Sequence, residues 1–173
     1  MPVSFFVIVR GPLGVGKTTM ARRLARDLRG EYVAIDEVLE RHDLERWEDG
    51  YISERSFLRA NEFAVEAAEV ALRQGEPVVI DGNFYWRSAL EDLERRLAYP
   101  HIVFTLKAPL AICIARDAAR GAPLGDEGTR AVHAIVSRFD YGVPIDASGA
   151  LEETYARLLG SLPESLTAAA QSR

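Results

Sequence analysis

The chain has little cysteine, lysine or histidine. It contains one cysteine and two lysines in 173 residues. A single cysteine, Cys113, excludes an intramolecular disulfide framework and fits a reducing compartment such as the cytosol. Its apolar helical surroundings favour a core position over a nucleophile. The three histidines, at positions 42, 101 and 133, show no metal-ligand spacing, so we assign them no metal chemistry.

The chain also lacks an excess of positive charge. Its net charge of −5 argues against an extended nucleic-acid interface, although a local basic patch would still suffice for a short nucleic acid. The first apolar run is too short for a signal or membrane segment, so we expect a cytoplasmic protein with no membrane partner. The length and the 48% hydrophobic content fit one globular domain over residues 1–173, with the oligomeric state left open.

The most informative pattern is Gly-Pro-Leu-Gly-Val-Gly-Lys-Thr-Thr over residues 11–19. It fits G-x-x-x-x-G-K-[ST], the phosphate-binding loop of nucleoside-triphosphate enzymes. Glycines let the backbone approach a polyphosphate, and successive amides with the start of a helix form an anion nest. Lys17 would reach the β- and γ-phosphates, and the Thr18 hydroxyl would bind Mg²⁺. The expected ATP-binding residues in this loop are Gly11, Leu13, Gly14, Val15, Gly16, Lys17, Thr18 and Thr19.

The flanking sequence supports this interpretation. Phe5–Val9 is a short apolar run typical of a buried parallel strand, and Met20, Leu24 and Leu28 follow at helical spacing. A chain that uses arginine almost everywhere keeps lysine at position 17, where a compact ammonium suits phosphates better than a planar guanidinium. The alternative is an ordinary glycine-rich turn between a strand and a helix.

Apolar strands alternate with helical patterns, which predicts an α/β fold with a parallel sheet. Three of the expected strands lead into aspartates, at Asp36, Asp81 and Asp146, and open α/β sheets bind ligands at that edge. The expected strands are Phe5–Val9, Tyr32–Ile35, Pro77–Ile80, His101–Leu106 and Val143–Ile145.

The remaining segments predict helices and one flexible loop. Gly121–Gly128 has the composition of a mobile loop and is flanked by arginines, so we expect a lid over phosphates at about residues 116–130. Residues 163–173 are small and polar and are expected to be poorly ordered. The expected helices begin near Lys17 and cover Glu54–Gln74 with Ser53 as N-cap, Ser88–Ala98, Leu110–Arg120, Thr129–Asp140 and Leu151–Leu162.

Two of the strand-end aspartates are candidates for the chemistry of phosphoryl transfer, which needs positioning and charge neutralisation. Asp36 would orient an acceptor hydroxyl and accept its proton as a base, or it would serve as the N-cap of a helix starting at Glu37. Asp81 would bind Mg²⁺ or hold the substrate, the alternative being a plain Asp-Gly turn.

Polar side chains after the third strand are candidates for holding an acceptor. Asn83 and Arg87 offer an amide and a guanidinium, and Phe84–Trp86 would wall a pocket or pack in the core. Arg55 lies near the expected acceptor side, where a solvated helix face is the alternative. We expect residues 37–60 to form most of the acceptor-binding segment.

Arg116 and Arg120 lie four residues apart on one face of a helix that leads into the expected lid. One guanidinium would stack on a nucleobase and the other would neutralise the transferred phosphate. The alternative is a solvated helix face paired with nearby acids such as Asp117.

Taken together, these motifs resemble the small P-loop kinases of the nucleoside, shikimate and gluconate kinase group. The chain looks closest to the branch of zeta-toxin-like, polynucleotide-kinase-like and chloramphenicol-phosphotransferase-like proteins. The resemblance rests on residues 11–19, Asp36, residues 81–87, residues 114–120 and residues 146–148. It departs from shikimate kinases, which carry Gly-Gly-Gly where this chain has Asp81-Gly82-Asn83.

The resemblance implies a three-layer sandwich with a five-stranded parallel sheet of order 2-3-1-4-5 and a mobile lid. It also implies that Asp36 is the base, that Arg116 stacks on adenine and that Arg120 contacts phosphates. The predicted function is transfer of the γ-phosphoryl group from ATP-Mg²⁺ to a hydroxyl of a small-molecule acceptor, with Lys17 and Arg120 stabilising charge. The alternatives are a nucleotide-dependent regulatory ATPase and a polynucleotide 5′-kinase.

Overall fold

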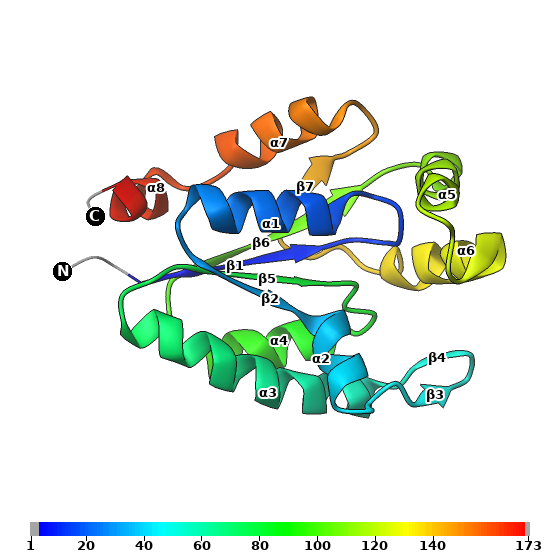
Figure 1. Ribbon diagram of the computed structural model, residues 1–173, viewed down its shortest axis with the longest axis horizontal. Coiled ribbons are helices and arrows are strands. Elements are labelled where there is room, and N and C mark those ends of the chain that lie inside the picture. The colour runs from blue at the N-terminus through cyan, green and yellow to red at the C-terminus, as the bar shows by residue number, and fades with distance from the viewer. Residues whose placement is uncertain (1–3, 172–173) are drawn as a thin grey trace.

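The computed structural model describes residues 4–171 as a five-stranded parallel sheet between two layers of helices (Figure 1). The strand order is β2-β5-β1-β6-β7. When only the strands of this sheet are counted, that is the expected order 2-3-1-4-5, so the predicted fold class is confirmed. The strands are β1 (Phe6–Arg10), β2 (Glu31–Ala34), β5 (Val78–Gly82), β6 (His101–Lys107) and β7 (Val143–Asp146).

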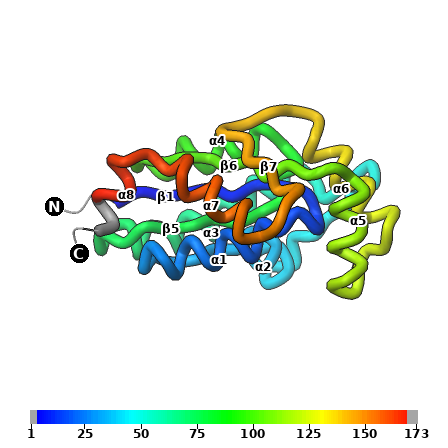
Figure 2. The backbone as a smooth tube through the Cα atoms, turned by 90° about the horizontal axis from the view of Figure 1, so that it is seen from above, coloured from blue at the N-terminus to red at the C-terminus, as the bar shows by residue number. Residues whose placement is uncertain are grey.

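The helices cover both faces of the sheet and one end of it. Figure 1 places α1, α7 and α8 over one face and α3 and α4 over the other, and both backbone views place α5 and α6 beyond the ends of β1 and β5 (Figure 2). Among helices formed by residues 4–171, none is both long and apolar enough for a membrane crossing. The helices are α1 (Lys17–Asp27), α2 (Ile35–Arg41), α3 (Glu54–Arg73), α4 (Arg87–Arg96), α5 (Leu110–Ala119), α6 (Gly125–Val136), α7 (Leu151–Gly160) and α8 (Glu164–Gln171).

The sheet separates two hydrophobic cores because alternate side chains of β1 point to opposite faces. Phe6 and Ile8 pack with side chains of α3 and α4, whereas Val7 and Val9 pack with side chains of α1 and α7. Burial on both faces explains why β1 is a continuous apolar run rather than an alternating one. Cys113 lies buried in the second core, as the sequence predicts.

Some local features follow the sequence and others do not. Ser53 caps α3 as expected, because its Oγ accepts a hydrogen bond from the Ser56 amide at 3.2 Å. The hairpin β3 (Trp47–Glu48) and β4 (Tyr51–Ile52) was not predicted, since its strands are too short to show alternation; its turn has positive φ at Asp49 and Gly50, typical of tight hairpins.

The C-terminal segment also differs from the expectation of poor order. Residues 164–171 form α8, which is anchored by the buried side chain of Leu166 in the second core. Residues 172 and 173 lie outside the described part of the chain.

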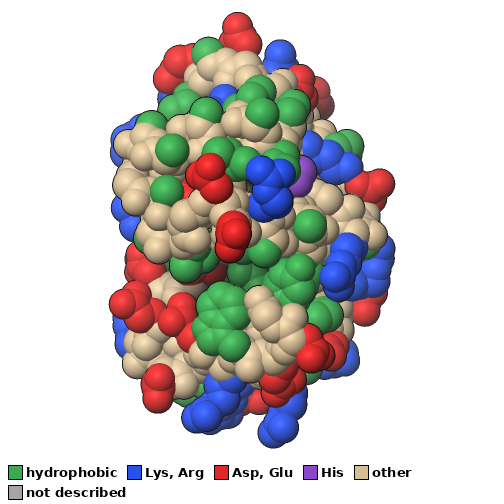
Figure 3. Space-filling model, turned by 90° about the vertical axis from the view of Figure 1, so that its right-hand side faces the viewer, with side chains coloured by type: hydrophobic (Ala, Val, Ile, Leu, Met, Phe, Trp, Pro, Cys, Tyr) green, Lys and Arg blue, Asp and Glu red, His purple; other side chains and the backbone are tan. Residues whose placement is uncertain are grey.

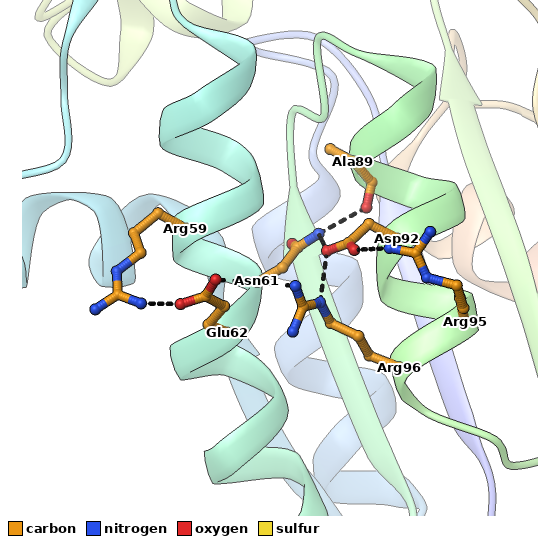
Figure 4. Close-up of polar contacts among 7 residues, drawn as sticks. All are labelled: Arg59, Asn61, Glu62, Ala89, Asp92, Arg95 and Arg96. Atoms are coloured by element: carbon orange, nitrogen blue, oxygen red, sulfur yellow. Dashed lines mark hydrogen bonds and ion pairs between the residues drawn. The ribbon is translucent and has the colours of Figure 1, made fainter.

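A polar cluster joins α3 to α4 (Figure 4). Asn61 is fully buried, and its Nδ2 donates to Ala89 O at 2.7 Å and to Asp92 Oδ2 at 3.1 Å. Arg96 Nε donates to the same Asp92 oxygen at 2.9 Å, and Arg95 pairs with the other oxygen. Asp92 is therefore the shared acceptor that holds the two helices together at this point.

Replacing Asp92 with alanine should lower the free energy of unfolding by about 1–3 kcal/mol, because the buried Asn61 amide loses an acceptor. Urea unfolding followed by circular dichroism would measure the change. The control is Glu62→Gln, which removes a more exposed ion-pair partner of Arg59 and Arg96 and should cost less than about 1 kcal/mol. Equal stabilities of Asp92→Ala and the parent protein would refute the assigned role.

Candidate active site

The glycine-rich loop lies between β1 and α1, in the predicted order of strand, loop and helix. Gly16 is the N-cap of α1 with φ +99°, and Gly14 has φ +74°, both in the left-handed region that favours glycine. A Cβ atom at Gly14 would lie 2.1 Å from the carbonyl oxygen of Cys113 in α5, so a side chain cannot be accommodated there. Gly11 is different, because its φ is not positive; a Cβ atom there would lie 2.8 Å from Val15 Cγ1 and 3.1 Å from Leu106 O in β6.

The loop opens onto a cleft of about 260 Å³. No side chain caps the first turn of α1, so its amides are free to bind an anion. The side chains of Leu13 and Val15 pack against the two cores, so their expected contribution to nucleotide binding, through the backbone alone, stays a prediction. The cleft is lined by Pro12, Gly14, Gly16, Lys17, Thr18, Thr19, Arg116, Ala119, Arg120 and Leu151.

Arg116 in α5 ties the loop to the segment between β7 and α7. Its Nη1 donates to Ala147 O at 2.7 Å and to Val15 O at 3.3 Å, and its Nη2 donates to Gly149 O at 2.7 Å. These bonds use the edges of the guanidinium and leave its faces for stacking. This arrangement is compatible with the expected contact between Arg116 and a nucleobase, which stays a prediction.

Arg120 reaches the same cleft from the end of α5. It pairs with the buried Asp117 at 2.5 Å, and Asp117 also accepts a hydrogen bond from Thr129 Oγ1 in α6 at 2.8 Å. Asp117 therefore fixes both the Arg120 side chain and the packing of α5 on α6. The alternative in which Arg120 pairs with Asp117 is thus present in the structure, and Arg120 also lines the cleft.

The predicted lid loop is shorter than the sequence suggested. The helix α6 begins at Gly125 rather than near Thr129, so the irregular segment between α5 and α6 covers only residues 120–124. The acidic side chains of Asp126 and Glu127 in the first turn favour this earlier start, as does the Thr129 hydroxyl that bonds Gly125 O. The glycines that indicated a loop lie largely inside the helix.

Asp36 occupies the first turn of α2, beside the end of β5. The N-cap of this helix is Ala34, so the alternative that Asp36 caps a helix starting at Glu37 is wrong. Its side chain is accessible to solvent, but surrounding protein crowds it, and this desolvation raises the pKa of the carboxyl. Lys17 lowers that pKa, whereas Asp81, Glu45 and Glu37 raise it. Lys17, Asp36 and Asp81 therefore form one electrostatic group.

Asp81 is buried at the end of β5 with one oxygen unsatisfied. Its Oδ2 accepts a hydrogen bond from the Tyr32 hydroxyl at 2.8 Å, and its Oδ1 has no partner. A buried carboxylate oxygen without a donor fits a cation or a ligand donor. Within residues 4–171 no three acidic, His or Cys side chains converge as a cation cage. Mg²⁺ in nucleotide enzymes needs only one or two protein oxygens beside phosphates and water, so Asp81 and Thr18 fit it.

Asn83 and Tyr85 follow Asp81 at the same edge. Asn83 is buried, and its Oδ1 lacks a partner. Tyr85 packs edge-on against Tyr51 with centroids 6.1 Å apart, and burial together with the charge of Asp36 raises the pKa of its hydroxyl. Tyr85 thus packs in the first core and also lies near Asp36. Core packing and a place in the wall of a pocket, the two roles predicted for this aromatic, are therefore compatible.

The predicted acceptor-binding residues Arg87 and Arg55 form no hydrogen bond with Asp36 in the described chain. The Arg87 guanidinium stacks over Phe139 and donates to Asp140 O at 3.1 Å, and Arg55 lines a surface depression beside Arg46 and Arg59. Neither forms an ion pair with Asp36 in the described chain. Their expected contact with an acceptor stays a prediction.

Sequence reasoning missed three residues of this edge. Tyr32 orients Asp81, Glu45 adds negative charge near Asp36, and Arg10 is completely buried directly before the loop. Of these three, only Arg10 left a signal in the sequence, because it is an arginine at the end of an otherwise apolar strand. The face at this end of the molecule mixes acidic and basic side chains without a continuous basic surface (Figure 3).

A family model described as an AAA domain matches residues 6–140, which is more than half of the chain and includes the loop, Asp36, Asp81 and Arg116. A search of curated proteins finds no match.

Solved structures share the fold at low sequence identity. A gluconokinase from Sinorhizobium meliloti 1021 has a TM-score of 0.73 at 17% identity, covering 99% of this chain and 95% of its own. The APS kinase of Mycobacterium tuberculosis, in complex with AMPPNP and APS, has a TM-score of 0.68 at 15% identity, covering 92% and 98%. A chain of the Pnkp1/Rnl/Hen1 RNA repair complex has a TM-score of 0.61 at 18% identity, covering 82% of this chain and 48% of its own. These likenesses show that the chain has the fold of P-loop kinases.

Replacing Asp36 with asparagine should raise the melting temperature at pH 7. The raised pKa means that the folded protein favours the neutral carboxyl, so this contribution to stability is lost as pH rises through the folded-state pKa. Asparagine stays neutral, so the gain should shrink toward zero as pH falls below the ordinary aspartate pKa. Thermal unfolding at several pH values would measure it.

The matched control is Glu37→Gln, in the same helical turn. Glu37 is exposed and pairs with Arg22 at 3.2 Å, so its loss should leave the melting temperature unchanged or slightly lower at pH 7. A lower melting temperature for Asp36→Asn than for the parent at pH 7 would contradict the assigned environment of Asp36.

Proposed function

We propose that this chain, which belongs to the AAA domain family, is an ATP-dependent phosphotransferase acting on a hydroxyl of a small-molecule acceptor. The observation that carries the proposal is the shared environment of Lys17, Asp36 and Asp81, which meet at one edge of the sheet. Phosphoryl transfer needs a phosphate cradle, cations and a carboxylate near the acceptor hydroxyl, and each lies at this edge. The fold shared with kinases of small molecules supports the proposal.

The donor side is the loop and the cleft beside it. The amides at the start of α1 and the Lys17 ammonium hold the β- and γ-phosphates, while Arg116 stacks on the base. Arg120 neutralises charge on the transferred group from the end of α5. Thr18 and Asp81 would hold Mg²⁺, which would supply further charge neutralisation. Residues 116–130 act as the lid.

The acceptor side begins at Asp36. Its carboxylate orients the attacking hydroxyl and takes up its proton, and the raised pKa brings its basicity closer to the working pH. Asn83 presents an unpaired buried oxygen, Oδ1, that accepts a hydrogen bond from another hydroxyl of the acceptor. Residues 37–60, which include Tyr51 and the β3–β4 hairpin, complete the pocket on this side.

Other acceptors fit less well. The carboxylates of Glu45, Glu37 and Asp81 surround Asp36, and this negative charge disfavours a polynucleotide whose phosphates flank the reacting hydroxyl. A regulatory ATPase often places a water-activating glutamate after the strand-end aspartate, where this chain has Gly82.

A panel of acceptors tests the proposed function. ADP release would be followed with Mg²⁺-ATP and sugars, polyols, amino alcohols, nucleosides or a 5′-hydroxyl oligonucleotide. We expect a small hydroxyl compound to stimulate turnover, and Asp36→Asn to reduce that turnover by about 10²–10⁴-fold, the usual contribution of a general base. Binding of a fluorescent ATP analogue should change less than about twofold, because Asp36 does not contact the donor phosphates.

Two results would count against this proposal. Turnover that no acceptor stimulates, and that Asp36→Asn leaves unchanged, favours the regulatory ATPase. Strongest stimulation by the oligonucleotide favours the polynucleotide 5′-kinase.

The two lysines allow a matched test of the loop. Lys17→Ala should reduce transfer by about 10²–10³-fold or more, the typical effect of removing one charge-stabilising donor. Lys107→Ala removes an exposed lysine that pairs with Asp140 and should leave turnover unchanged. Circular dichroism would verify that both variants fold, and full activity of Lys17→Ala would exclude the assigned role.

A further inference from the structure

Arg10 is a completely buried arginine at the end of β1, directly before Gly11 of the phosphate-binding loop. Within the described residues it forms no ion pair with a carboxylate. Burial and the nearby Arg87 lower the pKa of its guanidinium to about 10, so the group stays charged at neutral pH. Asp140 is a nearby opposite charge that raises this pKa, but no carboxylate pairs directly with the guanidinium within the described residues. A buried charge without a directly paired carboxylate is costly and is retained only where its hydrogen bonds serve a purpose.

The guanidinium contacts two segments that are far apart in the sequence, at Phe84 and at residues 136–139. Its Nε donates to Phe84 O at 3.2 Å, and its Nη2 donates to Val136 O at 2.6 Å. The ring of Phe139 covers the guanidinium, with its centroid 4.1 Å from Cζ. The third nitrogen, Nη1, has no partner.

The first contact holds a strained backbone. Phe84 has φ +46°, in the left-handed region that a bulky residue rarely adopts, and it lies between Asn83 and Tyr85. Such a conformation persists only when surrounding contacts fix it. The bond from Arg10 to the Phe84 carbonyl is one such contact, and it thereby fixes how Asn83 and Tyr85 are presented beside Asp36.

The second contact holds the lid helix α6, whose first part belongs to the proposed lid. Val136 is the last residue of α6, and its carbonyl belongs to the C-terminal turn, which attracts cations. The start of α6 carries Thr129, which bonds Asp117 and so connects to Arg120. Arg10 therefore links β1, which leads into the phosphate-binding loop, to two other parts of the proposed site. One is the acceptor-side loop at Phe84, and the other is α6, which connects to Arg120.

We propose that Arg10 is a positioning residue that fixes the acceptor-side loop at Phe84 and the lid helix α6 against the strand carrying the phosphate-binding loop. It acts through these backbone carbonyls and does not touch the phosphates. Lysine could not replace it fully, because the single nitrogen of an ammonium cannot occupy the positions of both Nε and Nη2, which donate to Phe84 O and Val136 O. The inference rests on the proposed function only for its kinetic consequence.

Hydrogen–deuterium exchange tests the structural part without any acceptor. Arg10→Met keeps the length of the side chain and removes the donors. In this variant, with the fluorescent analogue mant-ATP and Mg²⁺ present, amide exchange should become at least tenfold faster in residues 82–87 and 129–138. Arg10→Lys should give an intermediate change, because it retains the positive charge and one donor nitrogen.

The control is Leu158→Ala, which creates a cavity in the second core, on the opposite face of the sheet. It should lower the melting temperature while leaving exchange in residues 82–87 and 129–138 close to that of the parent. If Leu158→Ala and Arg10→Met give the same exchange pattern, Arg10 contributes only general stability and the inference is overturned.

The kinetic part measures ATP turnover, with the best acceptor of the panel or with water. Arg10→Met should lower kcat about tenfold while KM for ATP changes less than twofold, because the loop itself is not altered. A proportional rise in KM for ATP would overturn the inference. Failure of every acceptor with the parent protein would count against the proposed function alone, since the exchange measurement would still decide the role of Arg10.

Discussion

The structure depends on the position of β1 between β5 and β6 in one parallel sheet. Backbone hydrogen bonds align Val9 with Asp81 and Arg10 with Gly82 on one side, and Arg10 with Thr105 on the other. Because parallel strands end at the same edge, this register brings the phosphate-binding loop next to Asp81 and places α2, with Asp36, beside both. Every proposed step of phosphoryl transfer takes place at that edge.

The same edge concentrates polar groups that the protein leaves unsatisfied. Three of the four buried side-chain atoms without a partner in the described residues are Arg10 Nη1, Asp81 Oδ1 and Asn83 Oδ1, and only Asn61 Oδ1 lies between α3 and α4. Burying such groups costs stability, as does the crowding that raises the pKa of Asp36. The hydrophobic cores on both faces of the sheet offset that cost, so the fold carries a site that is unfavourable by itself.

Much of this arrangement follows from local sequence patterns. Apolar runs gave the five strands to within about two residues, which is the usual precision for strand ends, and their confirmed order agrees with the family resemblance. Patterns failed where a distant contact decided the outcome. Thr129 near the start of α6 bonds the distant Asp117 in α5 in addition to the local groups that favour a start at Gly125, and the order of α8 depends on Leu166 entering the second core. The two-residue strands of the β3–β4 hairpin are too short to show a periodicity.

The sequence by itself determined the loop over residues 11–19, the parallel α/β fold and the aspartates that follow two neighbouring strands, because each is written in consecutive residues. The tertiary structure alone decided which side chains share the edge with them. Arg10 is 126 residues from Val136, and Tyr32 is 49 from Asp81, so no local pattern reveals either contact. Arg87, which looked equivalent to other arginines in the sequence, contacts Phe139 and Asp140 instead of forming an ion pair with Asp36. Long-range burial and hydrogen bonding, which depend on how the elements pack, make that distinction.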